Sequence, residues 1–221
     1  MKQLIIKDFM VLRFMNLWML FMGILFGFIG AISTIPFSAN MIYGYGIFVM
    51  IYMFLMFSLQ IEEKSKSYIM VSSFPLNREK IVTAKYISII IYLLVSALFI
   101  ILVSNISIRL FTVTLSENTP SIFSLLFIIG ICLLFLSVYL PFQYYYMAKS
   151  QMFNSLFYGI LILLPNILSR YGFRIENIKW INSLVKIDLK NIIFIVLVIG
   201  ILMYLISLKV SQKIYKAKEF Y

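Results

Sequence analysis

The chain has 221 residues, of which 63% are hydrophobic and only 12% are charged, whereas soluble proteins average about 25% charged residues. Its 19 Lys and Arg residues outnumber 8 Asp and Glu residues, which gives a net charge of +11. This composition predicts an integral membrane protein made of helices. His is absent and the single Cys132 lies in an apolar run. These facts exclude intrachain disulfides, Cys/His zinc sites and His-based acid–base chemistry.

Residues 1–13 alternate charged or polar side chains with apolar ones. This pattern predicts an interfacial helix on the inner membrane surface, and the alternative is a cytoplasmic start to the first span. Lys2 and Lys7 before an apolar run could also suggest a cleaved signal peptide. We expect the first helix to be retained, because the apolar run is too long for a signal sequence and a second span follows at once.

Six transmembrane helices are predicted, because about 20 apolar residues are needed to cross the hydrocarbon core. Residues 14–61 contain no charge, which leaves room for two spans that reverse around residues 33–40, where Pro and small polar residues mark a turn. The other four predicted spans are 86–108, 121–142, 151–168 and 191–208. The fold class is therefore all-α, with one six-span permease-like domain over residues 1–221 and both termini on one side.

The short loops give the orientation. Thirteen Lys and Arg residues fall on the face that holds the termini and six on the other, so the termini are predicted to be cytoplasmic in a bacterial cell membrane. Because the basic residues flank apolar spans, they would face lipid head groups, and no nucleic-acid partner is expected. Residues 169–190 hold five of the six dissenting charges and are predicted to form short interfacial or re-entrant helices outside, with a solvated loop as the alternative.

A charged stretch, residues 62–86, joins the second and third spans. Residues 64–74 place apolar side chains largely on one side of a helix, and Pro75 ends that helix because a residue before proline avoids helical geometry. Asn77 is a good N-cap, so a second helix is predicted to start at Arg78 and run unbroken into the third span. An ordinary hairpin with solvated charges is the alternative.

Four motifs in this stretch resemble the signature of ABC-2 type membrane subunits of bacterial ATP-driven exporters. The motifs are Glu62-Glu63-Lys64-Ser65-Lys66, Ser72-Ser73-Phe74-Pro75-Leu76-Asn77-Arg78, Ile81-Val82 and Lys85-Tyr86. Phe74 stands where that family usually has Leu. Ile6-Lys7-Asp8 and the six-span layout are also similar, and within the family the chain resembles the permeases of staphylococcal phenol-soluble modulin exporters.

The resemblance implies a permease that is not an enzyme and needs no cofactor. It would pair with a second permease, itself or a sister chain, and dock on two cytoplasmic ATPase subunits. The residues implied in ATPase coupling are Glu62, Glu63, Lys66, Ser72, Pro75, Arg78, Lys85 and Tyr86. We expect Arg78 to hold the start of its helix through Glu62 or Glu63, or through lipid phosphate.

The predicted spans have no ionisable residue near their centres, whereas proton- or sodium-driven carriers commonly keep one there. This favours energy coupling from a partner. The many Phe, Met and Tyr residues suit amphipathic cargo such as a peptide, lipid or drug, although core packing and an aromatic belt explain the same residues. Gly23, Gly27 and Gly30 at spacings of three or four predict a close-packing face for a dimer, with tolerance of helix bending as the alternative.

Three other functions are alternatives. A vitamin-binding subunit of an energy-coupling importer has a similar size and span count, but it would lack the motifs around Pro75. A channel or accessory membrane protein is the second alternative, and nucleotide-independent ion conductance would favour it. An intramembrane protease built on Glu62 and Glu63 is not expected, since no His is available as a ligand or base.

Overall fold

The computed structural model describes residues 2–11, 13–32, 36–64, 77–110, 120–146 and 189–217. These residues form six helices and contain no strand, so the all-α prediction is confirmed for this part of the chain. The helices are α1 (Lys2–Val11), α2 (Arg13–Ile32), α3 (Pro36–Lys64), α5 (Arg78–Leu110), α6 (Ile122–Tyr145) and α9 (Leu189–Ala217).

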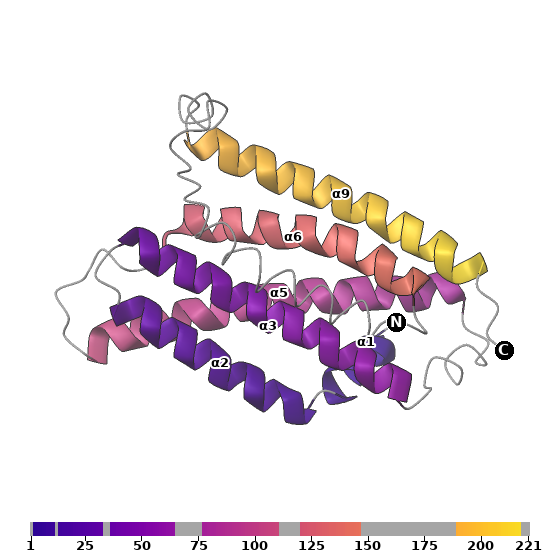
Figure 1. Cartoon of the computed structure of the whole chain (residues 1–221), viewed down its shortest axis with the longest axis horizontal. Coiled ribbons are helices and arrows are strands. Elements are labelled where there is room, and N and C mark those ends of the chain that lie inside the picture. Colours follow the sequence, from indigo (N-terminus) through magenta and orange to yellow (C-terminus); the bar gives the residue numbers. More distant parts are fainter. Residues whose placement is uncertain are drawn as a thin grey trace, which may run out of the picture.

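The five long helices run side by side along one axis (Figure 1). α2 is antiparallel to α3, and α5 is antiparallel to both α3 and α9, whereas α6 and α9 run in the same direction. We call one end of the bundle the base. It holds α1, the first turns of α5, and the last turns of α3, α6 and α9. The segments that contain Ile32, Pro36, Leu110 and Leu189 lie at the opposite end.

Four helices are long and apolar enough to cross a membrane: the stretches are Ala39–Ser58, Arg78–Leu110, Ile122–Tyr145 and Asn191–Ala217. The apolar part of α2, Asn16–Ile32, is shorter. The predicted fifth span, nearly all of the loop 169–190 and the segment 65–76 lie outside the described residues. The chain is thus a multi-pass membrane protein, and the count of six spans stays a prediction.

Local signals account for the starts of α5 and α6. α5 begins at Arg78, as predicted from Pro75 and Asn77. α6 begins after Ser121, whose hydroxyl accepts a hydrogen bond from the Ser124 amide at 3.1 Å, as an N-cap does. α9 continues to Ala217, well beyond the predicted span end at 208. The span estimate stopped at the first lysine, whereas a helix can continue past the hydrocarbon once its apolar part has crossed.

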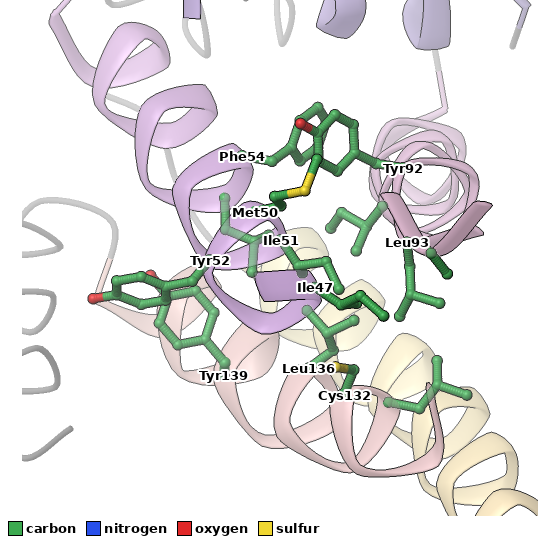
Figure 2. Close-up of a cluster of buried hydrophobic side chains, with 14 of the residues drawn as sticks. Ile47, Met50, Ile51, Tyr52, Phe54, Tyr92, Leu93, Cys132, Leu136 and Tyr139 are labelled. Atoms are coloured by element: carbon green, nitrogen blue, oxygen red, sulfur yellow. The ribbon is translucent and has the colours of Figure 1, made fainter. Parts of the chain in front are cut away.

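The core lies between α3, α5 and α6 and is rich in aromatic rings (Figure 2). Phe54 stacks on Tyr92 with ring centroids 4.2 Å apart, and Phe48 meets Phe135 edge-on at 4.9 Å. Such pairs stabilise a core beyond the area they bury. Large apolar side chains also cover the outside, for example Leu98 at 61% exposure. An outward apolar surface on packed helices is what a lipid-facing bundle requires.

The glycines assigned to a dimer face require a correction. A Cβ placed on Gly23 would lie 2.8 Å from the Phe99 ring, and one on Gly30 would clash with the Tyr43 ring. At Gly27 the nearest atom is Val103 Cγ1, at 2.6 Å. These neighbours belong to α3 and α5 of the same chain, so this face is closed within the chain and is not available to a second copy. Their spacing did indicate close helix packing, but it does not say which helix is the neighbour.

Candidate coupling site at the base of the bundle

The first turn of α5 is fixed by its own cap. Asn77 Oδ1 accepts a hydrogen bond from the Glu79 amide at 3.1 Å, and the Asn77 carbonyl accepts one from the Lys80 amide at 2.9 Å. Glu79 also places a negative charge at the positive end of the helix. The predicted N-cap role of Asn77 is therefore confirmed, and α5 is a well-defined helix from its first residue.

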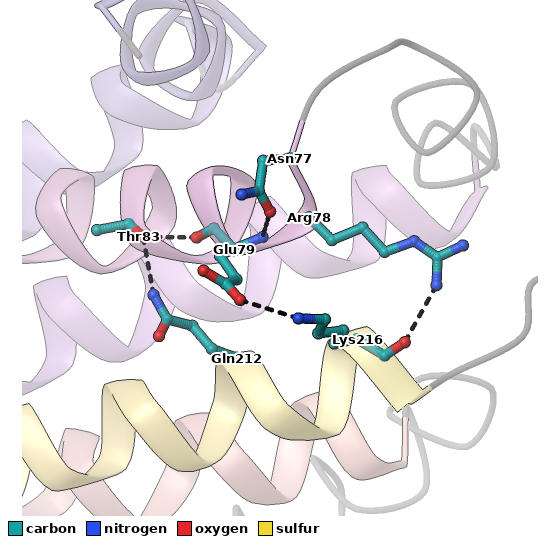
Figure 3. Close-up of polar contacts among 6 residues, drawn as sticks. All are labelled: Asn77, Arg78, Glu79, Thr83, Gln212 and Lys216. Carbon is teal, nitrogen blue, oxygen red and sulfur yellow. Dashed lines mark hydrogen bonds and ion pairs between the residues drawn. The ribbon is translucent and has the colours of Figure 1, made fainter.

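Polar side chains join the start of α5 to the last turns of α9 (Figure 3). Arg78 Nη1 donates to the Lys216 carbonyl at 3.3 Å, and Lys216 Nζ lies 3.4 Å from Glu79 Oε1. One turn further into α5, Gln212 Nε2 donates to Thr83 Oγ1 at 3.1 Å. We call these five residues the clasp. Arg78 thus has a partner that neither sequence-based alternative named, the carboxyl end of α9, where a cation is favourable.

Above the clasp, Tyr86 is fully buried between α5 and α9. Its hydroxyl lies 2.8 Å from Ser207 Oγ and 2.7 Å from Ser211 Oγ. The Tyr204 hydroxyl donates to the Tyr86 carbonyl at 2.9 Å. In a hydrocarbon environment no water is present to form hydrogen bonds with these groups if the helices separate, so each bond opposes separation of α5 and α9.

On another side of α5, a buried ion pair links α5 to α1 and α3. Lys85 Nζ lies 3.6 Å from Asp8 Oδ1 and donates a hydrogen bond to Ser58 Oγ of α3. Asp8 Oδ2 accepts a hydrogen bond from Ser88 Oγ at 3.1 Å. Asp8 and Lys85 are 5% and 6% exposed, and charges this deeply buried persist only when they are paired.

The sequence matches a model of a known protein family. The model described as ABC-2 family transporter protein matches residues 3–216, nearly the whole chain. The chain belongs to the ABC-2 transporter family. No curated protein and no solved structure matches it. The family is one of membrane transporter components, so the protein is a permease-type subunit.

The structure brings three of the eight motif residues of this ABC-2 protein together on α5. Of these, Lys85 and Tyr86 are buried against α1, α3 and α9. Both side chains therefore contact neighbouring helices, and their assignment to ATPase coupling stays a prediction. Glu62 and Glu63 belong to the last turn of α3, and Lys66, Ser72 and Pro75 lie outside the described residues.

The main residues missed from sequence are on α9 and α1. Tyr204, Ser207, Ser211 and Tyr215 recur every three or four residues in an apolar helix, and all four are at most 3% exposed. This spacing is a stripe along one helix face, which would have indicated an inward-facing polar surface. Asp8 was visible only as part of a motif, with no signal for its partner.

The described residues of this site form a set of contacts between helices. Within the described ranges, no group of three or more Cys, Asp or Glu side chains could hold a metal ion. What the site provides is one helix, α5, whose first three turns are tied to α1, α3 and α9 by hydrogen bonds and ion pairs. Movement applied at Arg78 would therefore act on all four helices together.

Proposed function

We propose that this ABC-2 protein is the membrane-spanning subunit of an ATP-driven exporter and that separate cytoplasmic ATPase subunits drive it. The family match supports the transporter class. The observation that carries the proposal further is the capped start of α5 directly after the motif segment. A helix that begins at the membrane surface and is bonded to three neighbours suits the transfer of force from a partner.

In this mechanism the segment 62–77 contacts the ATPase and pushes or pulls on Arg78. Because α5 is one continuous helix of 33 residues, about 50 Å long at 1.5 Å per residue, the displacement reaches the far side of the membrane without an intervening hinge. The clasp and the Tyr86 contacts would make α9 follow α5. The Asp8–Lys85 pair would bring α1 with them.

The proposed topology has six spans with the base in the cytoplasm. Of the twelve basic residues in the described helices, nine belong to segments at the base, Arg13 begins α2, and Arg109 and Lys190 lie at the opposite end. This asymmetry supports a cytoplasmic base. The parallel directions of α6 and α9 support an additional crossing between them, which the predicted span 151–168 would provide.

The cargo path is proposed to lie between two permeases. The centre of the described bundle is filled by packed aromatic rings, so a path along a contact with a second permease suits amphipathic cargo better than one through a single chain. The narrower resemblance to modulin exporters suggests amphipathic peptides as the first cargo to test. The packing of Gly23 and Gly30 against α5 and α3 supports a contact with the second permease through another surface.

The test is cargo-stimulated ATPase activity of the permease reconstituted with the ATPase encoded beside its gene. We expect Pro75→Gly, which frees the backbone that proline restricts, and the double change Glu62→Lys/Glu63→Lys to lower stimulation while insertion stays normal. Arg109→Gln, a charge change at the opposite end, is the control. Normal stimulation in both variants at normal expression would show that this stretch only anchors the hairpin.

A further inference from the structure

Helix α9 has two opposite faces with inverted polarity. Its inward stripe consists of Gly200, Tyr204, Ser207, Ser211 and Tyr215, all buried. Its outward stripe begins with apolar residues, including Leu202 at 55% and Ile206 at 57% exposure. Hydroxyls inside and large apolar side chains outside mean that the outward stripe faces hydrocarbon rather than water.

The outward stripe changes chemistry at Lys209. After Ile195, Ile199, Leu202 and Ile206, the same spacing of three and four continues with Lys209, Lys213 and Lys216, all exposed. α9 has 29 residues and is roughly 43 Å long, against a hydrocarbon core of about 30 Å. The last two to three turns, which follow an apolar stripe of this length, therefore lie at the depth of the lipid head groups.

Among the described residues, two of these lysines have no acidic partner. Lys216 pairs with Glu79, but in the described part of the chain no acidic side chain pairs with Lys209 or Lys213. Residues four apart on a helix are neighbours, and like charges at this spacing destabilise it. An anion held between the two ammonium groups removes that repulsion.

Charge and continuity select the occupant of this face. A second copy that used the same face about a two-fold axis would bring lysines against lysines, which is unfavourable. A phospholipid matches both halves of the stripe, with acyl chains along Ile206 and Leu202 and a phosphate at the lysines. We propose that Lys209 and Lys213 form a binding site for the head group of an anionic phospholipid at the base of α9.

The experiment measures which lipid lies beside α9 in reconstituted full-length protein. A tryptophan is introduced by Ile206→Trp, with Trp18 and Trp180 changed to Phe, so that fluorescence reports on lipid at this position alone. The protein is placed in phosphatidylcholine vesicles that contain a fixed minor fraction of either brominated phosphatidylglycerol or brominated phosphatidylcholine. The bromine quenches tryptophan only at short range.

We expect phosphatidylglycerol to be enriched at this position, by roughly fivefold per lysine at low salt, and the enrichment to fall as salt rises. Lys209→Gln/Lys213→Gln should bring the two lipids to equal quenching. Lys209→Arg/Lys213→Arg keeps both charges and should preserve the preference. Arg13→Gln, on α2 at the other side of the bundle (Figure 1), removes a distant exposed charge and should also preserve it.

Equal quenching by the two lipids in the unsubstituted background would overturn the proposal. So would a preference that survives Lys209→Gln/Lys213→Gln, because it would then arise from the general charge of the base. None of these measurements uses an ATPase or a cargo, so the outcome is independent of the exporter assignment.

Discussion

At the scale of single residues, the buried pair Asp8–Lys85 is asymmetric. Asp8 Oδ1 also lies 3.8 Å from Lys7 Nζ, and Asp8 Oδ2 accepts from Ser88. Loss of Lys85 therefore leaves Asp8 with a second cation and a hydroxyl donor. Loss of the Asp8 charge leaves the Lys85 ammonium buried beside the Ser58 hydroxyl but without this anion. Because Asp8 keeps a cation and a hydroxyl donor when Lys85 is lost, whereas Lys85 loses the anion of this pair when the Asp8 charge is lost, the two changes are not equivalent.

We predict that Asp8→Asn lowers the free energy of unfolding by roughly 3–5 kcal/mol and that Lys85→Met costs less. The double variant should be less destabilised than the sum of the single changes, since it strands no charge. The measurement is thermal or denaturant unfolding in detergent, arranged as a double-mutant cycle. Equal losses for the two single variants would contradict the asymmetry.

The clasp supplies the matched control for that cycle. Lys216 and Glu79 are 70% and 44% exposed as side chains, and exposed pairs contribute only about 0–1 kcal/mol. Lys216→Gln should therefore leave the unfolding free energy nearly unchanged. A loss as large as that of Asp8→Asn would mean that burial does not explain the difference between the pairs.

At the scale of elements, two buried glycines differ in the kind of atom that a larger side chain would meet. A Cβ on Gly200 of α9 would lie 2.9 Å from the Gly130 carbonyl oxygen of α6, which is backbone and cannot move alone. A Cβ on Gly23 of α2 would meet the Phe99 ring at 2.8 Å and Met50 Sδ at 3.1 Å. Those atoms belong to side chains that can rotate away. Replacing glycine by alanine also raises helix propensity by about 1 kcal/mol at both sites.

We predict that Gly200→Ala forces α6 and α9 apart and lowers the unfolding free energy by roughly 1–3 kcal/mol, whereas Gly23→Ala is close to neutral. Both are measured by unfolding in detergent, and the oligomeric state is measured by light scattering. Because α3 and α5 cover Gly23, its substitution should leave the oligomeric state unchanged. A change of oligomeric state on Gly23→Ala would restore the dimer interpretation of that face.

The same elements show which features of the fold can be predicted from the sequence. Asn77 and Pro75 are local signals, so the start of α5 at Arg78 was predictable. The clasp was not, because Arg78 and Lys216 are 138 residues apart and nothing in an apolar pattern pairs one helix with another. Gly23 illustrates the same gap, since a small residue predicts close packing without naming the neighbour. The depth of Lys85 was missed because a charge near a span end is ordinarily assigned to the surface.

At the scale of the whole molecule, we expect the two ends of the bundle to lie on opposite sides of the membrane, so that only one end is accessible from outside the cell. The base holds most of the basic residues of the described helices, and α9 ends there with Lys213 exposed. Arg109 is exposed in the last turn of α5 at the opposite end. Because basic residues are retained on the cytoplasmic side, a cytoplasmic base places Lys213 inside and Arg109 outside. The termini and the segment 169–190 are then on opposite sides of the membrane.

We predict that, in a Cys132→Ser background, a membrane-impermeant maleimide labels Arg109→Cys in intact cells but labels Lys213→Cys only after permeabilisation. Protease should likewise spare tags at Met1 and Tyr221 and cleave near Gly172, if a crossing separates α6 from α9. Labelling at both cysteines from outside would mean that α5 and α9 do not share the assumed orientation. Labelling of Lys213→Cys alone in intact cells would mean that the base lies outside the cell. A cytoplasmic ATPase could then not reach the segment before Arg78. The orientation of this one pair of residues therefore decides whether the base can serve as the coupling site.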